Sequence, residues 1–319
     1  MDFMNCYFHL SDSNLRKCDC GFERCRTECS DSQHHLEECS SLRSLNIRNM
    51  SLKEKNEIIK SLGFWRMIKY QQSDPEKWSS LMNLMSHQQE RSKSKLFKES
   101  VKHLIENLQL LGAKGCNEDL LSRLQGILET NSHSFNKNIQ HIFGNFSLIS
   151  HSCIPNSEHL LAGEQTIVRA KVEISKGEEI TIRYSDLCLH REILRKGMKT
   201  SWLFNCSCPR CSDGSDLGTE ASSFKCDNCE KGFVAENGDQ ISCQNCNKIT
   251  SYKQFVAQAE RLRKMELSCK SREDIPELIE EIEKNGGHAL YHSVIQLKIQ
   301  FMESSMDKIE SRTCHLVSN

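Results

Sequence analysis

The sequence has few of the residues that mark long disordered segments or a membrane span. Proline occurs only 4 times in 319 residues, and hydrophobic residues make up 37% of the chain. This composition does not favour long disorder, and no apolar run approaches the roughly 20 residues that a membrane-spanning helix needs. The first ten residues contain the acidic Asp2 and the polar Asn5 and His9, and no lysine or arginine, which argues against a secretory signal peptide. The length is sufficient for two or more domains with their own cores.

The sequence also lacks an excess of charge of either sign. Its 42 basic and 43 acidic residues give a formal net charge of -1. Charge alone therefore predicts no general attraction to nucleic acid or to an anionic membrane. Because there is no basic stripe, a DNA-binding zinc protein is the weakest of the functional interpretations, and direct binding to nucleic acid is not expected.

Cysteine, in contrast, is abundant, with 18 residues in the chain. Since nothing indicates secretion, we interpret clustered thiols as zinc ligands in a reducing compartment rather than as disulfides. The clusters lie at 18–39, 206–211 and 226–246. Ordinary thiols are the interpretation for the isolated cysteines, which are Cys116, Cys188, Cys269 and Cys314.

Hydrophobic periodicity predicts helices in the first half of the chain and short strands after it. Apolar residues recur at intervals of three and four between residues 40 and 130, where Asp74-Pro75 is a helix start and Asn117 a cap for a helix over 118–128. Strands are expected at 145–149, 165–170 and 179–184. A helical connector follows at 186–203, a linker rich in Gly, Ser and Asp at 212–223, and further helices from residue 252.

Three short motifs follow one another in the second half of the chain. They are His151-Ser152-Cys153-Ile154-Pro155-Asn156, then the segment 177–184 with sequence GEEITIRY, then Cys206-Ser207-Cys208-Pro209-Arg210-Cys211. Each is weak alone: Gly-Glu-Glu-Ile is common in hairpins, and Tyr184 by itself could be a core residue of a strand. In this order and spacing they resemble the C-terminal half of a SET methyltransferase core and its post-SET zinc knot. The chain is similar to the SET and MYND domain-containing family of arthropod type.

The resemblance implies an α+β fold with a SET-like β core containing a pseudoknot, a helical insertion, zinc-stapled modules and a C-terminal helical segment. The expected divisions are a partial MYND-type zinc finger at 1–42, the helical insertion at 43–130, the C-terminal half of the SET core at 131–203, the post-SET zinc knot at 204–215, a zinc-ribbon-like module at 216–250 and the helical segment at 251–319.

The resemblance also implies a protein-lysine methyltransferase that uses S-adenosylmethionine. In this family the segment that corresponds to 150–156 threads under the loop before the tyrosine strand and forms the cofactor pocket. Tyr184 is the expected catalytic residue, since its hydroxyl would line the lysine channel. The expected cofactor-binding residues are Asn131, Ser150, His151, Tyr184 and Phe204.

Two zinc sites are expected in the second half of the chain. Cys206, Cys208 and Cys211 supply three thiolates, and the family takes the fourth from the position of Cys153; the alternative is a surface cysteine cluster without metal. The pairs Cys226/Cys229 and Cys243/Cys246, separated by 13 residues, have the spacing of a zinc ribbon. Their knuckles lack interleaved basic and aromatic residues, so a structural role is expected.

The N-terminal cysteines resemble the second half of a MYND finger. The resemblance makes Cys18, Cys20, His35 and Cys39 one site and Cys25 and Cys29 half of another, with His34 as an alternative to His35. The Cys18–Cys20 gap is one residue shorter than the usual pattern, and the first Cys-x2-Cys pair of such fingers is not found here.

Two further features depart from the family pattern. Ser150 stands where the family motif has asparagine, and no glycine-rich strand-turn precedes Cys18. Two hypotheses follow. The first is an active methyltransferase that acts on a protein lysine, histone or otherwise, in transcriptional regulation. The second is a catalytically inactive zinc-dependent adaptor whose MYND-like surface takes proline-rich corepressor peptides. Either would place the chain in the nucleus, the cytoplasm or both.

Overall fold

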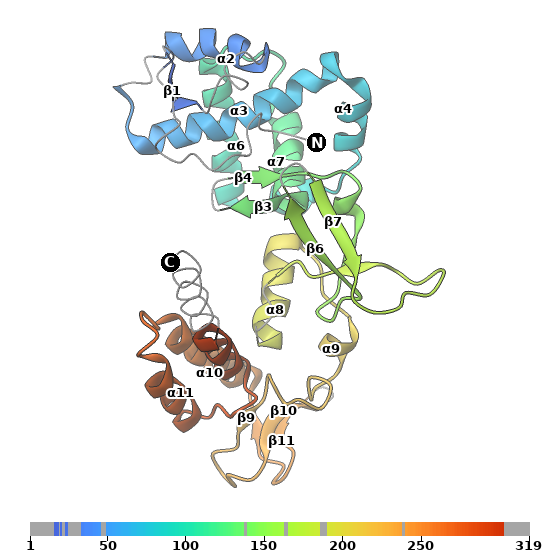
Figure 1. Cartoon of the computed structure of the whole chain (residues 1–319), viewed down its shortest axis with the longest axis vertical. Coiled ribbons are helices and arrows are strands. Elements are labelled where there is room, and N and C mark those ends of the chain that lie inside the picture. Colours follow the sequence, from blue (N-terminus) through green and yellow to red (C-terminus); the bar gives the residue numbers. More distant parts are fainter. Residues whose placement is uncertain are drawn as a thin grey trace, which may run out of the picture. The chain divides into compact units, whose positions relative to one another are not determined.

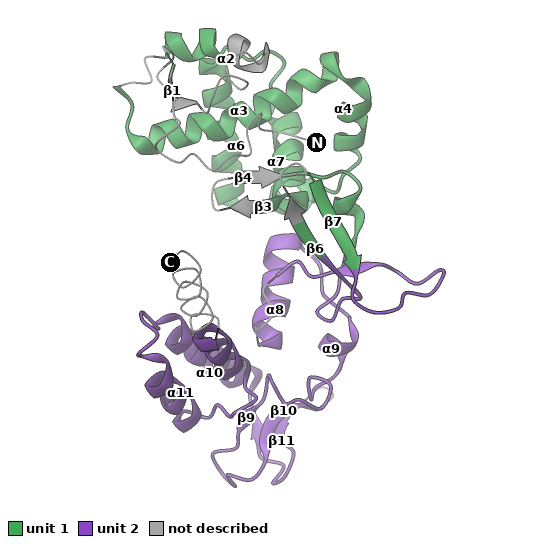
Figure 2. Ribbon diagram, in the orientation of Figure 1, with its two compact units in different colours: residues 1–149, 159–169 green, residues 150–158, 170–319 purple. Residues whose placement is uncertain are grey.

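The computed structural model describes residues 16–18, 20, 23–24, 33–45, 49–136, 139–162, 165–185, 190–237 and 240–302 (Figure 1). The chain forms two compact units (Figure 2). Unit 1 comprises residues 1–149 and 159–169, and unit 2 comprises 150–158 and 170–319. Among the described residues, no helix combines the length and the apolar character required to cross a membrane.

Helices make up most of unit 1, as the periodicity of residues 40–130 predicts. They are α2 (Gln33–Ser44), α3 (Leu52–Ser73), α4 (Pro75–Met82), α5 (Gln88–Arg91), α6 (Lys95–Leu110) and α7 (Glu118–Asn131). The predicted caps are present, since Asp74 accepts a hydrogen bond from the Lys77 backbone N–H and Asn117 accepts one from that of Leu120. Each satisfies a backbone donor that the first helical turn leaves unpaired.

The core of unit 1 is formed where these helices pack on one another. Gly126 of α7 shows how close the packing is, because a Cβ at this position would lie 2.2 Å from the carbonyl oxygen of Ser86. The side chains that are fully buried at its centre include Met67, Leu81, Leu108, Leu111, Leu121, Leu124 and Ile127.

The strands of unit 1 are short. β1 (Arg16–Lys17) pairs with β2 (Glu23–Arg24), and β3 (His133–Asn136) pairs with β4 (Ile139–His141), both antiparallel. The strand expected at 145–149 is wrong: residues 146–148 form the 3₁₀ helix η3 (Phe146–Leu148). The buried Phe146 packs its ring against His133 at 4.5 Å and His159 at 5.0 Å between centroids, so a single turn buries the apolar residue that suggested a strand.

A two-stranded sheet of β6 (Ser157–Ala162) and β7 (Gln165–Ala170) lies where the chain passes between the units. β7 has the bounds that the alternating pattern at 165–170 predicts. The burial of its side chains does not alternate, however, because five of its six residues are exposed. The pattern therefore predicts the strand correctly but not a buried face.

Unit 2 begins with β5 (Ser150–His151), which pairs in parallel with β8 (Thr181–Ile182). The expected connector is helical over α8 (Arg191–Gly197) and the π-helix η4 (Met198–Trp202). After α9 (Pro209–Ser212) comes a sheet in the order β12-β11-β10-β9, built from β9 (Phe224–Lys225), β10 (Phe233–Asn237), β11 (Gln240–Cys243) and β12 (Ile249–Thr250). The helices α10 (Tyr252–Leu267) and α11 (Ile275–Lys284) and a helical segment at 292–302 follow.

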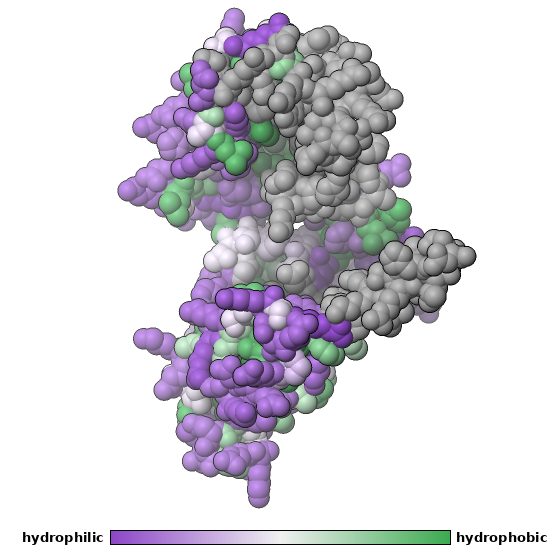
Figure 3. All heavy atoms as spheres, turned by 60° about the vertical axis from the view of Figure 1, so that its left-hand side comes forward, coloured by the Kyte–Doolittle hydropathy of each residue, from purple (hydrophilic) through white to green (hydrophobic). Residues whose placement is uncertain are grey.

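The core of unit 2 joins the small sheet to the C-terminal helices. Phe224 of β9 packs against Phe255 of α10, with ring centroids 5.0 Å apart, and against Tyr291 at 5.4 Å. The outer faces of these helices are polar: where they are seen in Figure 3, hydrophilic residues predominate and hydrophobic ones are scattered. The small sheet thus does not stand alone but shares a hydrophobic core with the helices.

Candidate functional site

The site is built on the pairing of two segments that lie about 30 residues apart in the sequence. Ser150 pairs with Thr181 and His151 with Ile182, and the Ser152 backbone N–H donates to the Ile182 carbonyl oxygen at 2.9 Å. Ile182 is completely buried. The first two of the three sequence motifs therefore lie side by side, as the resemblance implies.

Asn156, the last residue of the first motif, fixes this pairing with its side chain. Its Nδ2 donates to the Glu179 carbonyl oxygen at 2.8 Å, and its Oδ1 accepts the Thr181 backbone N–H at 2.9 Å. Its own backbone N–H donates to the Thr181 hydroxyl at 3.2 Å. One carboxamide thus supplies the donor and the acceptor that the neighbouring backbone needs, which a shorter side chain could not do.

Four rings gather next to the paired strands. Tyr184 lies 5.2 Å from His151, 5.6 Å from Trp202 and 6.5 Å from Phe204, measured between ring centroids. Leu203, between the last two aromatic residues, has a φ of 60°, a left-handed conformation that is uncommon for residues other than glycine. All four rings are half-buried, so each has a surface on which a flat ligand could stack.

His151 connects this aromatic group to the first sulfur cluster. Its Nδ1 accepts the Tyr184 backbone N–H at 3.1 Å, and its Nε2 lies 3.3 Å from Cys153 Sγ. Burial, with a smaller contribution from Arg183, lowers the pKa of His151 to about 4. Burial and then Glu179 raise the pKa of Tyr184, so its phenol is protonated at neutral pH.

The sulfurs of Cys153, Cys206, Cys208 and Cys211 lie within 4.8 Å of one another. Cys153 Sγ is 3.6 Å from that of Cys211 and 3.9 Å from that of Cys206. The hydrogen bond between Cys153 and Cys211 lowers the pKa of Cys211 and raises that of Cys153, so the two thiols compete for one negative charge unless a cation lies between them. Four sulfurs at such separations fit a tetrahedral structural zinc ion.

A second set of four sulfurs lies in the small sheet. Cys226, Cys229, Cys243 and Cys246 are also within 4.8 Å of one another. Backbone N–H groups point at these sulfurs, from Asn228 to Cys226 and from Asn245 to Cys243, both at 3.4 Å. Gly232 leaves the space that this needs, since a Cβ there would lie 2.6 Å from Cys243 Sγ.

A third set lies in unit 1, where Cys18, Cys20 and Cys39 are buried with their sulfurs within 4.8 Å of one another. Cys25, Cys29 and the side chains of His34 and His35 lie outside the described residues. The structure thus brings together three of the four residues expected for this site and does not describe the fourth.

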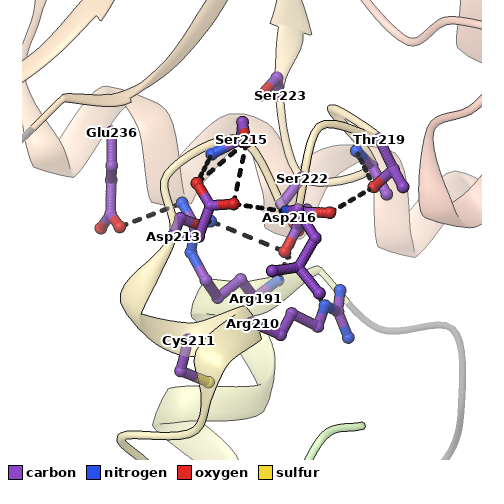
Figure 4. A network of polar contacts seen from close by, with 12 residues as sticks. Arg191, Arg210, Cys211, Asp213, Ser215, Asp216, Thr219, Ser222, Ser223 and Glu236 are labelled. Atoms are coloured by element: carbon purple, nitrogen blue, oxygen red, sulfur yellow. Dashed lines mark hydrogen bonds and ion pairs between the residues drawn. The ribbon is translucent and has the colours of Figure 1, made fainter.

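Two arginines of α8 tie the first sulfur cluster to the second. Arg195 donates to the Cys211 carbonyl oxygen through Nη2, and its Nη1 lies 2.9 Å from Glu236 on β10. Arg191 is fully buried, and its Nη2 lies 3.0 Å from the same carboxylate. It also donates to the Asp213 carbonyl oxygen and lies 3.6 Å from Asp216 (Figure 4).

The segment at 212–223 is therefore not only a linker, because it supplies partners for the buried Arg191. It contains no strand and ends the helix α9 at Ser212, but Asp216, Ser222 and Ser223 are buried. The Asp213 carboxylate accepts from the Ser215 and Leu217 backbone N–H groups. Its Gly, Ser and Asp content is explained by these turns, which need short polar side chains.

Of the predicted cofactor-binding residues, Ser150, His151, Tyr184 and Phe204 lie in unit 2 and Asn131 lies in unit 1. The Asn131 side chain is buried and donates to the carbonyl oxygens of Met85 and Ile127, both at 2.7 Å, so both of its N–H donors are used inside unit 1. Its role at a cofactor stays a prediction.

The structure adds two residues to the site that the sequence motifs do not contain, Trp202 and Arg195, and gives a new role to Asn156, which the first motif does contain. Trp202 precedes the left-handed Leu203, and the π-helical turn that carries it is a feature often found at functional sites. Asn156 joins the first two motifs with its side chain, and Arg195 contacts the Cys211 carbonyl oxygen. For Trp202 the sequence offers one indication, which is its place two residues before Phe204, the aromatic residue that the family resemblance assigns to the cofactor site.

Comparison with known proteins agrees with this geometry. The SET domain family profile matches residues 22–185. The chain belongs to the SET domain family. The match covers unit 1 from residue 22 on and the paired strands β5 and β8 of unit 2, whereas Cys18 and Cys20 lie outside it.

Named relatives carry SET domains or methyltransferase names. The chain is 29% identical to "Histone-lysine N-methyltransferase ASHR1" of Arabidopsis thaliana over 172 residues. This aligned region covers 51% of this chain and 34% of the relative. It is 27% identical over 222 residues to "SET domain-containing protein SmydA-8, isoform A" of Drosophila melanogaster (65% and 46%). It is 28% identical over 210 residues to "N-lysine methyltransferase SMYD2-B" of Xenopus laevis (63% and 48%). The chain thus aligns with less than half the length of these relatives.

Proposed function

We propose that this protein transfers a methyl group from S-adenosylmethionine to a lysine side chain of another protein. The main support for the proposal is the geometry of unit 2. There Ser150 and His151 pair with Thr181 and Ile182, the His151 ring packs against Tyr184, and Cys153 meets the sulfurs of Cys206, Cys208 and Cys211. Membership of the SET family and the names of the relatives support the same activity.

The residues of unit 2 fit the binding of this cofactor. Phe204, Trp202 and Tyr184 offer half-exposed ring faces for an adenine, and the polar groups of Ser150 and His151 lie at the adjacent strand pair. When bound, S-adenosylmethionine would supply an electrophilic methyl group on a sulfonium. The contribution of the protein is then mainly to align a neutral lysine amine and to exclude water.

Tyr184 would orient the reacting groups through its hydroxyl. Since burial raises its pKa, the phenol keeps its proton and can donate a hydrogen bond at neutral pH. Its position is held from the backbone, because its N–H is bonded to His151 Nδ1.

The sulfur clusters would hold zinc ions of a structural kind. The Cys153/Cys206/Cys208/Cys211 set and the Cys226/Cys229/Cys243/Cys246 set each supply four thiolates, which leaves no open position for a substrate. The Cys18/Cys20/Cys39 set would take a third zinc with one further ligand, for which His35 is proposed.

The decisive experiment is calorimetry of the zinc-loaded chain with S-adenosylmethionine, followed by transfer of a radiolabelled methyl group to core histones and to a lysine-rich peptide. We expect binding, and we expect Tyr184→Phe to lower the rate of transfer at least tenfold, about 1.4 kcal/mol in barrier. The thermal midpoint should not change, because the ring is retained. Unchanged turnover in the variant would remove the role assigned to Tyr184.

Ser150 favours a second candidate, a zinc-dependent adaptor without catalytic activity that takes proline-rich peptides at its MYND-like finger. Serine is shorter than the asparagine of the family motif and carries one hydroxyl in place of a carboxamide. Absence of cofactor binding at millimolar S-adenosylmethionine, in a chain shown to be folded and metal-loaded, would favour the adaptor over the enzyme.

A further inference from the structure

The His151 side chain contacts both the expected catalytic residue, Tyr184, and an expected zinc ligand, Cys153. On one side is the backbone of Tyr184, and on the other is the sulfur of Cys153. The Tyr184 N–H can only donate, so Nδ1 must be the acceptor of that bond and carries no proton. An imidazole with a bare Nδ1 is neutral and carries its single proton on Nε2.

We infer that His151 is a positioning residue that donates its Nε2–H to the Cys153 thiolate and so couples the proposed zinc knot to the Tyr184 backbone. This inference rests on the zinc binding proposed above. The 3.3 Å separation of Nε2 from Sγ is suitable for a hydrogen bond to sulfur. Partners of this kind orient metal ligands and tune their basicity.

The surroundings of the imidazole fit this role. The ring is packed against Tyr184 at 5.2 Å and Phe204 at 6.0 Å between centroids, which limits its rotation. Arg183 donates to the Cys153 carbonyl oxygen at 2.8 Å, so the backbone of the ligand is also fixed from the Tyr184 strand. A hydrogen bond to a thiolate withdraws charge from the sulfur and makes it a weaker nucleophile.

Two matched substitutions separate the two bonds. In His151→Asn, Oδ1 takes the place of Nδ1 and keeps the acceptor for Tyr184, but nothing reaches Cys153. In His151→Gln, the side-chain amide takes the place of Nε2 and keeps a donor for Cys153, but the acceptor for Tyr184 is lost. Both variants are made in the full chain and loaded with zinc, and metal content is checked by elemental analysis.

The first measurement is alkylation of Cys153 by iodoacetamide, followed by peptide mass spectrometry, with Cys226 of the other cluster as the reference in the same sample. We expect alkylation of Cys153 to be several-fold faster in His151→Asn than in the unmodified chain, and close to the unmodified rate in His151→Gln. The rate at Cys226 should be equal in all three proteins.

The second measurement is hydrogen exchange at the Tyr184 amide, for which the opposite order is expected: faster exchange in His151→Gln and little change in His151→Asn. If the ring had only a structural role, both variants would raise the alkylation rate of Cys153 and the exchange rate of the Tyr184 amide alike. That result would overturn the inference. Equal readouts in all three proteins would overturn it as well. Failure of the chain to take up metal at the knot would instead contradict the proposed zinc site.

Discussion

At the scale of single residues, Ser150 is the position where one substitution tests the proposed chemistry. Ser150→Asn restores a carboxamide next to His151 on the paired strand, with one more donor than serine offers. A recovered hydrogen bond contributes roughly 1–3 kcal/mol where its partner would otherwise be unsatisfied. We expect S-adenosylmethionine to bind at least several-fold more tightly, as measured by calorimetry, with Ser150→Ala as the control that lacks any polar group. Equal affinity in all three chains would show that residue 150 does not face the cofactor.

His190 makes the stability of unit 2 dependent on pH. Its side chain is completely buried at the start of α8, and burial, Arg191, Arg210 and Arg195 lower its pKa to about 3. The rings of Tyr291 and His292 face it from the C-terminal segment, and the pKa of His292 is also lowered, mainly by burial. The unfolded chain takes up a proton near pH 6.5, whereas folded His190 does so near pH 3, so stability is lost as the pH falls below 6.5.

The size of this effect is roughly 1 kcal/mol for each pH unit below 6.5. His190→Asn keeps an acceptor for the Glu192 N–H that His190 now accepts through Nδ1 at 3.2 Å. Urea unfolding in excess zinc between pH 7 and pH 5.5 should give a shallower loss of stability in the variant. Since the metal sites are the same in both chains, an equal slope would show that His190 does not titrate in this way.

At the scale of elements, helix α8 holds the zinc knot and the zinc ribbon together through its buried charges. Arg191→Met would leave the carboxylates of Asp216 and Glu236 without this partner in a buried setting, where breaking an ion pair costs about 3–5 kcal/mol. We expect a loss of that order in the free energy of unfolding from urea titration. Lys196→Met, one turn further along the same helix, removes an exposed pair with Glu260 and should cost less than about 1 kcal/mol. Similar losses in the two variants would contradict the importance given to the buried network.

The sequence predicts some of these elements and site residues but not others, for physical reasons. Caps such as Asp74 and Asn117 are predictable because they bond to residues three positions away. The meeting of Cys153 with Cys211 was expected from metal stoichiometry and family resemblance, since four ligands must converge. The role of the Asn156 side chain is not predictable from the sequence, because its partners at 179–181 come next to it only when the strands pair. The 3₁₀ turn at 146–148 is not predictable from the sequence, because a short apolar run has no period that distinguishes a strand from a single helical turn.

At the scale of the whole molecule, the metal count tests the three sulfur sets together. We expect elemental analysis to give two zinc ions from unit 2 and a third from the Cys18/Cys20/Cys39 set. Cys153→Ser and Cys226→Ser should each remove one, and each should leave the other site filled. Because a small thiolate-rich module gains much of its folding free energy from metal, chelation should also lower the thermal midpoint of unit 2. A count that neither substitution changes would refute the ligand assignments.

The route of the chain through its two units has a consequence for synthesis on the ribosome. Residues 150–158 belong to the second unit and 159–169 return to the first. The first unit therefore lacks a part of itself until residue 169 has emerged, by which time a piece of the second has already been made. A released fragment of residues 1–149 should accordingly resist proteolysis less well than a released fragment of residues 1–170.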